Sequence, residues 1–111
     1  MTDRHISVGE ILLDIECELR RARLWEDELP SEEALASDQP FAIDTLQFHQ
    51  WLQFILLPRM HMLVEERLPL PSACGISPMA EEVYKEEMER MRPLLIQLQR
   101  LDKLFAGLPS P

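Results

Sequence analysis

Apolar residues recur at helical spacing in three separate stretches of the chain, and this pattern predicts three to four helices. In the first stretch, about residues 7–25, one face carries Val8, Ile11, Leu12, Ile15, Leu19 and Ala22. Ser7 and Glu10 have the spacing of a capping box, in which side chains accept hydrogen bonds from the free N–H groups at a helix start. Thr2 or Asp3 would cap an earlier start.

The second stretch, about residues 44–67, is apolar on two sides and therefore predicts a central helix packed by more than one neighbour. Asp44 and Gln47 have the spacing of a variant capping box at its start. Pro58 falls in its middle, where proline lacks an N–H group and clashes with the preceding turn, at a cost of about 3 kcal/mol in a regular helix. We therefore expect a kink near Pro58.

The third stretch runs from about residue 78 to residue 106 and predicts a seam of a helical bundle. Large side chains recur at every seventh position, namely Tyr84, Met91, Leu98 and Phe105. Leu94 and Leu101 lie between them. Ser77 is the expected cap, and Pro78 suits the first helical position. Pro93 interrupts the stretch, which leaves two alternatives: one helix kinked at Pro93, or two helices over about 78–91 and 93–106.

The segments between these stretches complete a single all-α domain over residues 1–111, an up-and-down helical bundle. Residues 26–43 form an acidic connecting segment, in which Ser31 caps one short turn and Phe41 and Ile43 anchor the segment to the bundle. Residues 68–77 form a Pro-rich loop. Residues 107–111 are expected to be a frayed tail.

Charge narrows the class of partner that this chain can bind. The net charge is −9, and residues 25–40 contain six acidic residues and no basic one. A surface of this kind disfavours direct binding of nucleic acid or of an anionic membrane, because both need Lys and Arg. Two interpretations remain: a solvated acidic linker that keeps the protein soluble, or a surface that binds a basic protein partner. The N-terminus lacks the order of a signal peptide, and no apolar stretch approaches the roughly 20 residues of a membrane span, so we expect a cytoplasmic protein.

Few residues suggest chemistry. His61 and Glu65 lie one helical turn apart, but two ligands do not make a metal site, and no further His or Cys pair completes one. Cys17 and Cys74 are expected to be reduced thiols, and neither forms an ordered triad with a histidine. Only three Gly are present, and no Gly-rich phosphate loop is recognisable. We therefore expect no metal and no cofactor, and favour a non-catalytic role over a catalytic one.

The cluster around Pro58 allows two interpretations. On a helical wheel Arg59 falls on the apolar stripe, where an arginine usually pairs with a carboxylate; Glu66 and Glu18 are the candidates. In the structural interpretation, the kinked helix is held by this ion pair and by hydrogen bonds of His61. In the functional interpretation, the kink opens a recess that exposes Arg59 and His61 to a ligand or partner.

Three blocks of sequence resemble the YqcC family of small bacterial proteins. They are QPFAIDTL (39–46), WLQFILLPRMH (51–61) and PLP (69–71), and LWEDELP (24–30) and RLDKLF (100–105) also fit. The resemblance implies an up-and-down helical bundle and no established activity or cofactor. Members of the family are often encoded beside a tRNA pseudouridine synthase of the C type, which implies an association with that enzyme.

The leading hypothesis is therefore a helical-bundle accessory protein whose partner is a basic RNA-modifying enzyme. The candidate partner or ligand site comprises Asp44, Trp51, Pro58, Arg59 and His61. One alternative is a small-molecule-binding or catalytic bundle that uses a recess at Arg59 and His61. Another is a homodimer that closes leftover apolar faces.

Overall fold

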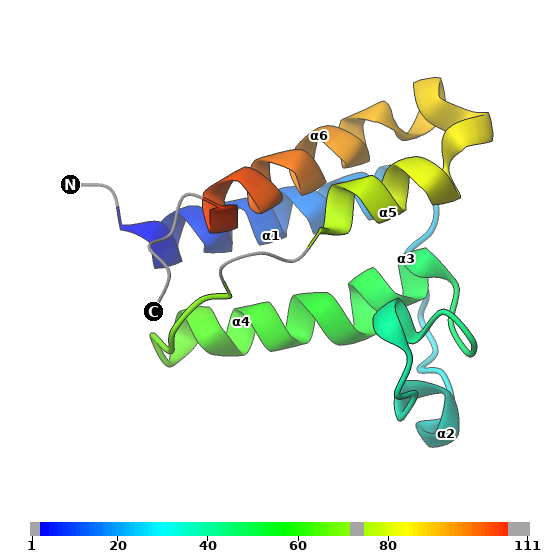
Figure 1. The fold of residues 1–111 in the computed structure, drawn as a ribbon, viewed down its shortest axis with the longest axis horizontal. Coiled ribbons are helices and arrows are strands. Elements are labelled where there is room, and N and C mark those ends of the chain that lie inside the picture. Colours follow the sequence, from blue (N-terminus) through cyan, green and yellow to red (C-terminus); the bar gives the residue numbers. More distant parts are fainter. Residues whose placement is uncertain (1–2, 72–74, 107–111) are drawn as a thin grey trace.

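The computed structural model describes residues 3–71 and 75–106, and these residues form an all-α bundle (Figure 1). The longer helical segments are α1 (Arg4–Arg21), the central helix, α5 (Ile76–Val83) and α6 (Met88–Ala106). The central helix comprises α3 (Phe48–Trp51), a π-helical stretch η2 (Leu52–Leu56) and α4 (Leu57–Glu65). Shorter elements are α2 (Glu32–Leu35) and the 3-10 turns η1 (Pro40–Ala42) and η3 (Lys85–Glu87).

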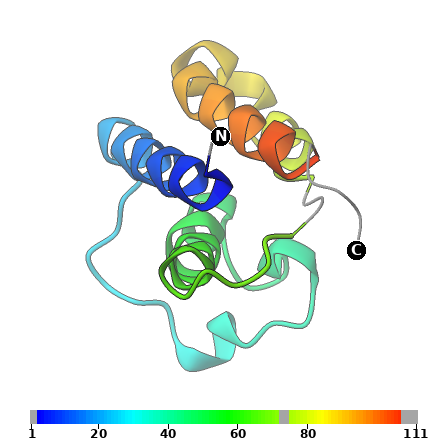
Figure 2. The same ribbon diagram turned by 90° about the vertical axis from the view of Figure 1, so that its left-hand side faces the viewer.

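The long segments alternate in direction along the bundle, as Figure 1 shows from the colour sequence. The helix α1 packs against both α6 and α4, and α5 packs against α6. Seen end-on in Figure 2, α1, the central helix and the α5–α6 pair surround one core. The predicted all-α, up-and-down bundle is thus confirmed. The expected tail, 107–111, lies outside the described residues.

The core contains the apolar stripes that the sequence pattern predicts. Residues of α1, the central helix and α6 that are at most 1% exposed are Val8, Leu12, Ile15, Leu19, Leu52, Met91, Leu94, Leu98, Leu101 and Phe105. Burial of such side chains contributes about 1.5–3 kcal/mol each, so this shared interior is the main source of stability. No helix among the described residues is both long and apolar enough to cross a membrane.

The first helix begins at the earlier of the two starts considered. The carboxylate of Asp3 accepts hydrogen bonds from the N–H groups of His5 (3.0 Å) and Ile6 (3.4 Å), so Asp3 is the cap. Ser7 lies inside the helix. The helix ends at Arg21, and the N–H of Leu24 then bonds to the carbonyl of Leu19 (2.9 Å), a bond typical of a Schellman ending.

The C-terminal region differs from both alternatives derived from Pro93. The chain reverses at Tyr84–Glu87, so α5 and α6 form an antiparallel hairpin, and Pro93 lies exposed inside α6. A continuous helix over 78–106 would be about 44 Å long at 1.5 Å per residue. The longest dimension of the molecule is 37 Å. Folding back lets α5 bury Ile76 and Ala80 in the same core.

The hairpin also changes the cap of α5. The Asp102 carboxylate of α6 accepts hydrogen bonds from the N–H groups of Ile76 (3.2 Å) and Ser77 (2.6 Å). The predicted cap Ser77 is therefore wrong: a residue distant in sequence caps the helix.

The central helix starts later than the sequence pattern predicts. Its first turn is Phe48–Trp51, and the side chain of Gln50 accepts a hydrogen bond from the N–H of Gln47 (2.8 Å). Asp44 does not cap it; its carboxylate accepts a hydrogen bond from the Ser37 hydroxyl (2.5 Å). Asp44 instead helps to fold the preceding connection.

The expected deformation near Pro58 takes the form of the π-helical stretch that directly precedes it. The N–H of Leu57 bonds to the carbonyl of Leu52, five residues back rather than four. Pro58 follows in the first turn of α4 and is exposed. The wide stretch lets the helix continue past the proline.

Candidate functional site

The connection between α1 and the central helix carries the most unusual features of the molecule. Figures 1 and 2 show that it swings away from the bundle, so that α2 projects below the central helix and apart from α1, α5 and α6. The serine cap predicted here is present, because the Ser31 hydroxyl accepts a hydrogen bond from the N–H of Ala34 (3.1 Å). The connection, residues 22–47, is therefore ordered, and we call it the strap.

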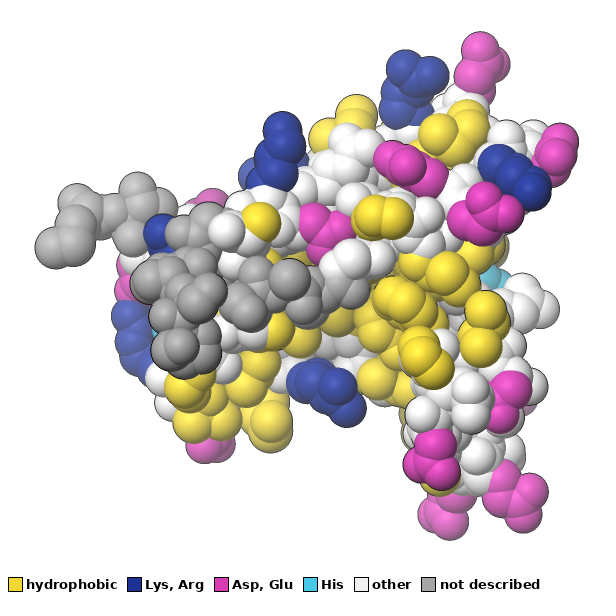
Figure 3. Space-filling model, in the orientation of Figure 1, with side chains coloured by type: hydrophobic (Ala, Val, Ile, Leu, Met, Phe, Trp, Pro, Cys, Tyr) yellow, Lys and Arg dark blue, Asp and Glu magenta, His cyan; other side chains and the backbone are white. Residues whose placement is uncertain are grey.

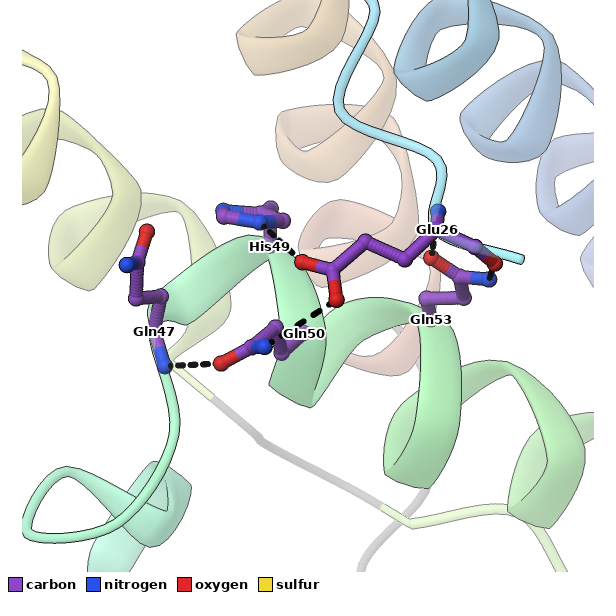
Figure 4. A network of polar contacts seen from close by, with 5 residues as sticks. All are labelled: Glu26, Gln47, His49, Gln50 and Gln53. Carbon is purple, nitrogen blue, oxygen red and sulfur yellow. Dashed lines mark hydrogen bonds and ion pairs between the residues drawn. The ribbon is translucent and has the colours of Figure 1, made fainter. Parts of the chain in front are cut away.

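A polar network fastens the beginning of the strap to the central helix (Figure 4). The Gln53 side-chain amide accepts a hydrogen bond from the N–H of Glu26 (2.9 Å) and donates one to its carbonyl (2.8 Å). The Glu26 carboxylate lies 2.8 Å from His49 Nε2 and accepts a hydrogen bond from Gln50 (3.2 Å). Glu26 thus contacts three side chains of one helix, and these contacts define where the strap leaves α1.

An aromatic cluster fastens the end of the strap. The rings of Phe41 and Trp51 meet edge-on with centroids 4.8 Å apart, and Phe48 stacks on Trp51 at 5.9 Å. Phe41 and Ala42 both adopt left-handed backbone conformations, with φ of 57° and 48°. Such conformations cost roughly 1–3 kcal/mol each in residues other than glycine. Aromatic packing and the burial of Ala42 offset this strain.

Two adjoining open recesses lie between the strap and the central helix, with volumes of about 510 Å³ and 280 Å³. Both are lined by Pro40, Phe41, Trp51, Ile55 and Arg59. Aromatic and aliphatic side chains with one arginine at the margin suit a ligand that offers an apolar group beside a negative charge. This pair of recesses, which we call the strap recess, is the candidate functional site.

The strap recess brings together some of the predicted site residues and not others. Trp51 and Arg59 line it, whereas Pro58, His61 and Asp44 are not among its lining residues. His61 is half-buried, and Pro58 and Asp44 are exposed. The structure therefore brings Arg59, but not His61, to the recess. Of the two anchors predicted for the strap, Phe41 packs against the core, but Ile43 is 61% exposed, so that second anchor is wrong.

Arg59 is not held inside the bundle by an ion pair. Its side chain is exposed, and within 3–71 and 75–106 it forms no ion pair with Glu66, Glu18 or any other carboxylate. Glu18 pairs instead with Arg21 (3.4 Å). The ion pair of the structural interpretation is therefore wrong. The π-helical stretch shifts the residues after it around the helix axis, whereas the wheel assumed a regular helix.

The strap also carries a concentration of negative charge. Five acidic residues in its part 27–38 are exposed: Asp27, Glu28, Glu32, Glu33 and Asp38. Among the described residues, none of the five is in an ion pair. Figure 3 shows acidic side chains gathered over the projection at the lower right, where α2 lies. The negative face of the strap therefore lies next to the strap recess.

Sequence reasoning missed Glu26 and Gln53, which position the strap. Gln53 is the one polar residue in the apolar run WLQFILL, and it is 7% exposed. A buried glutamine needs hydrogen-bond partners, so its place in that run was a usable signal, although the identity of Glu26 as the partner was not. Among the described residues, no group of three or more His, Cys, Asp or Glu side chains could hold a metal ion.

Comparison with known proteins places the chain in a family. A family model described as "DUF446: tRNA pseudouridine synthase C" matches residues 7–104. The uncharacterized protein YqcC of Escherichia coli is 36% identical over 102 residues, which cover 92% of this chain and 94% of that protein. A solution NMR structure of the E. coli YqcC protein has a TM-score of 0.86 and 34% identity, covering 99% of this chain and 94% of that one.

Two further relatives differ in how much of their length is matched. An uncharacterized protein of Haemophilus influenzae is 36% identical over 92 residues, or 81% of this chain and 87% of that protein. A protein of Pectobacterium carotovorum subsp. carotovorum named tRNA pseudouridine synthase C is 37% identical over 89 residues, or 80% of this chain but 24% of that protein. The extent and identity of these matches show that the chain belongs to the YqcC-like family.

Proposed function

We propose that this protein is a non-catalytic accessory protein that binds a tRNA-modifying enzyme of the pseudouridine synthase type. The observation that carries the proposal is the relative named tRNA pseudouridine synthase C, in which a segment similar to this chain makes up about a quarter of a longer protein. Two units that occur in one polypeptide in one organism commonly associate as separate chains in another. The family description, which carries the same enzyme name, supports the same association.

The charge of the strap supports a basic partner. An enzyme that handles tRNA needs Lys and Arg on its surface to replace the counterions of the phosphates. The five exposed acidic residues within 27–38 form no ion pair among the described residues, so their field extends into solvent. Opposite charges of this kind accelerate encounter and orient the partners. The strap would thus steer the enzyme to this side of the bundle.

The strap recess supplies the short-range part of the contact. Interfaces obtain most of their binding energy from a few residues, with Trp, Tyr and Arg prominent among them. Trp51 and Arg59 line the same recess next to the acidic strap. Steering by charge and anchoring in an aromatic recess are therefore available on one face.

Binding to the synthase from the same organism tests the proposal. Titration calorimetry at low ionic strength should detect a complex that weakens as salt approaches about 0.15 M, where charges are screened beyond about 8 Å. Joint substitution Glu32→Gln, Glu33→Gln and Asp38→Asn should weaken it by about tenfold, or ~0.5 kcal/mol per charge. The matched control is Glu10→Gln, Glu86→Gln and Glu89→Gln, which removes three exposed charges elsewhere.

Comparison of the two triple variants shows whether binding depends on the charges of the strap or only on the net charge of the protein. If both triple variants weaken the complex equally, the strap is not the docking face. If the wild-type protein shows no binding at low salt, the proposed association is wrong.

A further inference from the structure

The strap recess combines an apolar floor with a single charged lining residue. On the strap side, its lining includes Ser37 and Gln39, which flank the exposed acidic residue Asp38. On the helix side, the margin is Arg59. Between them lie the apolar side chains of Phe41, Trp51, Phe54 and Ile55. A ligand that fills this site therefore meets an apolar floor and one cation, Arg59.

The guanidinium of Arg59 is exposed and available to a ligand. It forms neither a hydrogen bond nor an ion pair within 3–71 and 75–106. Arg4, Arg23 and Arg92 are likewise without an ion pair there, whereas Arg20, Arg21, Arg67, Arg90 and Arg100 each pair with a carboxylate. A guanidinium beside an apolar recess matches a carboxylate held next to an apolar group, because two parallel N–H···O bonds can form between them.

We propose that the strap recess binds a segment of the partner enzyme in which a large apolar side chain lies beside an Asp or Glu. The apolar side chain packs on Phe41 and Trp51, and the carboxylate pairs with Arg59. This inference rests on the proposed function, because it specifies which part of the basic partner makes the short-range contact. A uniformly basic face would meet repulsion from Arg59, so the partner's surface must contain this local acidic group.

The recess is held in shape before a partner arrives. Glu26 fixes the start of the strap through Gln53, His49 and Gln50. The left-handed residues Phe41 and Ala42 bring the Phe41 ring against Trp51. A preformed recess binds without the entropy cost of ordering its walls, which favours a specific contact over a loose one.

Reversing the charge of Arg59 distinguishes a specific contact in the strap recess from long-range electrostatic attraction. Arg59→Glu and the control Arg92→Glu make the same change in net charge, and both arginines are exposed without an ion pair among the described residues. If charge acted only through steering, each variant would bind a basic enzyme as well as or better than the wild-type protein. The proposal requires Arg59→Glu to weaken binding by at least about tenfold, with Arg92→Glu within about twofold of wild type.

The experiment is calorimetric titration with the synthase, followed by binding to short overlapping peptides that cover its sequence. Arg59→Lys should bind with intermediate affinity, because lysine keeps the charge but not the bidentate geometry. Peptides that bind should contain a large apolar residue next to an Asp or Glu, and should bind more weakly when that acid is changed to its amide. Circular dichroism of each variant confirms that the bundle is intact.

Each result decides between the two proposals. If the wild-type protein binds the synthase and the strap variant weakens the complex, but Arg59→Glu behaves like Arg92→Glu, the recess inference is wrong and the proposed function stands. Peptides that bind equally well with the acid replaced would also overturn the inference. No binding of the wild-type protein would overturn both.

Discussion

The side-chain amide of Gln53 bonds to both backbone groups of Glu26, accepting from its N–H at 2.9 Å and donating to its carbonyl at 2.8 Å. One side chain thus supplies the pair of contacts that a neighbouring strand would supply in a sheet. It does so from the π-helical stretch of the central helix, where Gln53 is nearly buried. The start of the strap is therefore positioned by a polar contact with the core.

The first prediction concerns this contact. Gln53→Ala removes two hydrogen bonds and leaves two backbone groups of Glu26 without partners, so the free energy of unfolding should fall by about 2–4 kcal/mol. Gln99→Ala is the control, because Gln99 is exposed and makes one bond, to Glu81 at 3.3 Å. Urea unfolding measures both. A loss below about 0.5 kcal/mol for Gln53→Ala would contradict the assigned role.

Much of the fold was predictable because it depends on periodic burial. The stripe of α1 and the seam of α6 depend on regular helical spacing, and the structure buries both. The reversal at Tyr84–Glu87 was missed because the heptad spacing continues through it: Tyr84 is in register with Met91 and is buried, yet it belongs to the turn. Periodicity records which residues are buried and not the direction of the chain between them.

The candidate site was only partly predictable, for a different reason. Trp51 and Arg59 were recognised as unusual, and both line the strap recess. The exposure of Arg59 was one of two interpretations of the sequence, and the choice between them depends on a π-helical stretch that a helical wheel does not contain. The contact between Glu26 and Gln53 was not foreseen, since these residues are 27 positions apart in the sequence. Local pattern carries no information on such a pairing.

The second prediction concerns the cap of α5. Asp102→Ala should lower the free energy of unfolding by about 1–2 kcal/mol, because the N–H groups of Ile76 and Ser77 lose their acceptor at the helix start. Asp102→Asn keeps an acceptor oxygen and should lose less. Hydrogen exchange at these two amides measures the effect directly. Unchanged exchange in the alanine variant would show that Asp102 is not the cap.

The third prediction concerns Tyr84, the only tyrosine of the chain. The pKa of Tyr84 is raised from its ordinary value of 10.0 to about 12. Burial is the largest cause, and the negative charge of Glu87 is the second. The titration of Tyr84 therefore leaves the free energy of unfolding unchanged below about pH 10 and lowers it as pH rises from about 10 to about 12, because the unfolded chain ionises first. Ultraviolet absorbance of the phenolate follows this titration. A folded protein that titrates near pH 10 would contradict the assignment.

Tyr84→Phe provides the matching variant. The Tyr84 hydroxyl is buried and has no hydrogen-bond partner among the described residues, so its removal costs no hydrogen bond there. The variant should be as stable as the wild-type protein at neutral pH, or more stable, because an unpaired buried hydroxyl is unfavourable. It should also lose the change in stability between about pH 10 and pH 12. A clear loss of stability at neutral pH would indicate a partner for the hydroxyl.

The fourth prediction concerns Pro58. In a regular helix, Pro58→Ala would restore about 3 kcal/mol. Because the π-helical stretch already precedes the proline and Pro58 is exposed, the substitution should change the free energy of unfolding by less than about 1 kcal/mol. Chemical denaturation measures the change. A gain near 3 kcal/mol would mean that the helix is strained at this position.

The central claim is that the acidic strap and the strap recess together form a docking face for a pseudouridine synthase. Its most direct test is the salt dependence of binding between the two purified proteins, measured with wild-type protein and with Arg59→Glu. We predict a complex at low salt that weakens as salt is added, and a weaker complex for Arg59→Glu despite its greater negative charge. Absence of a complex at low salt would contradict the account.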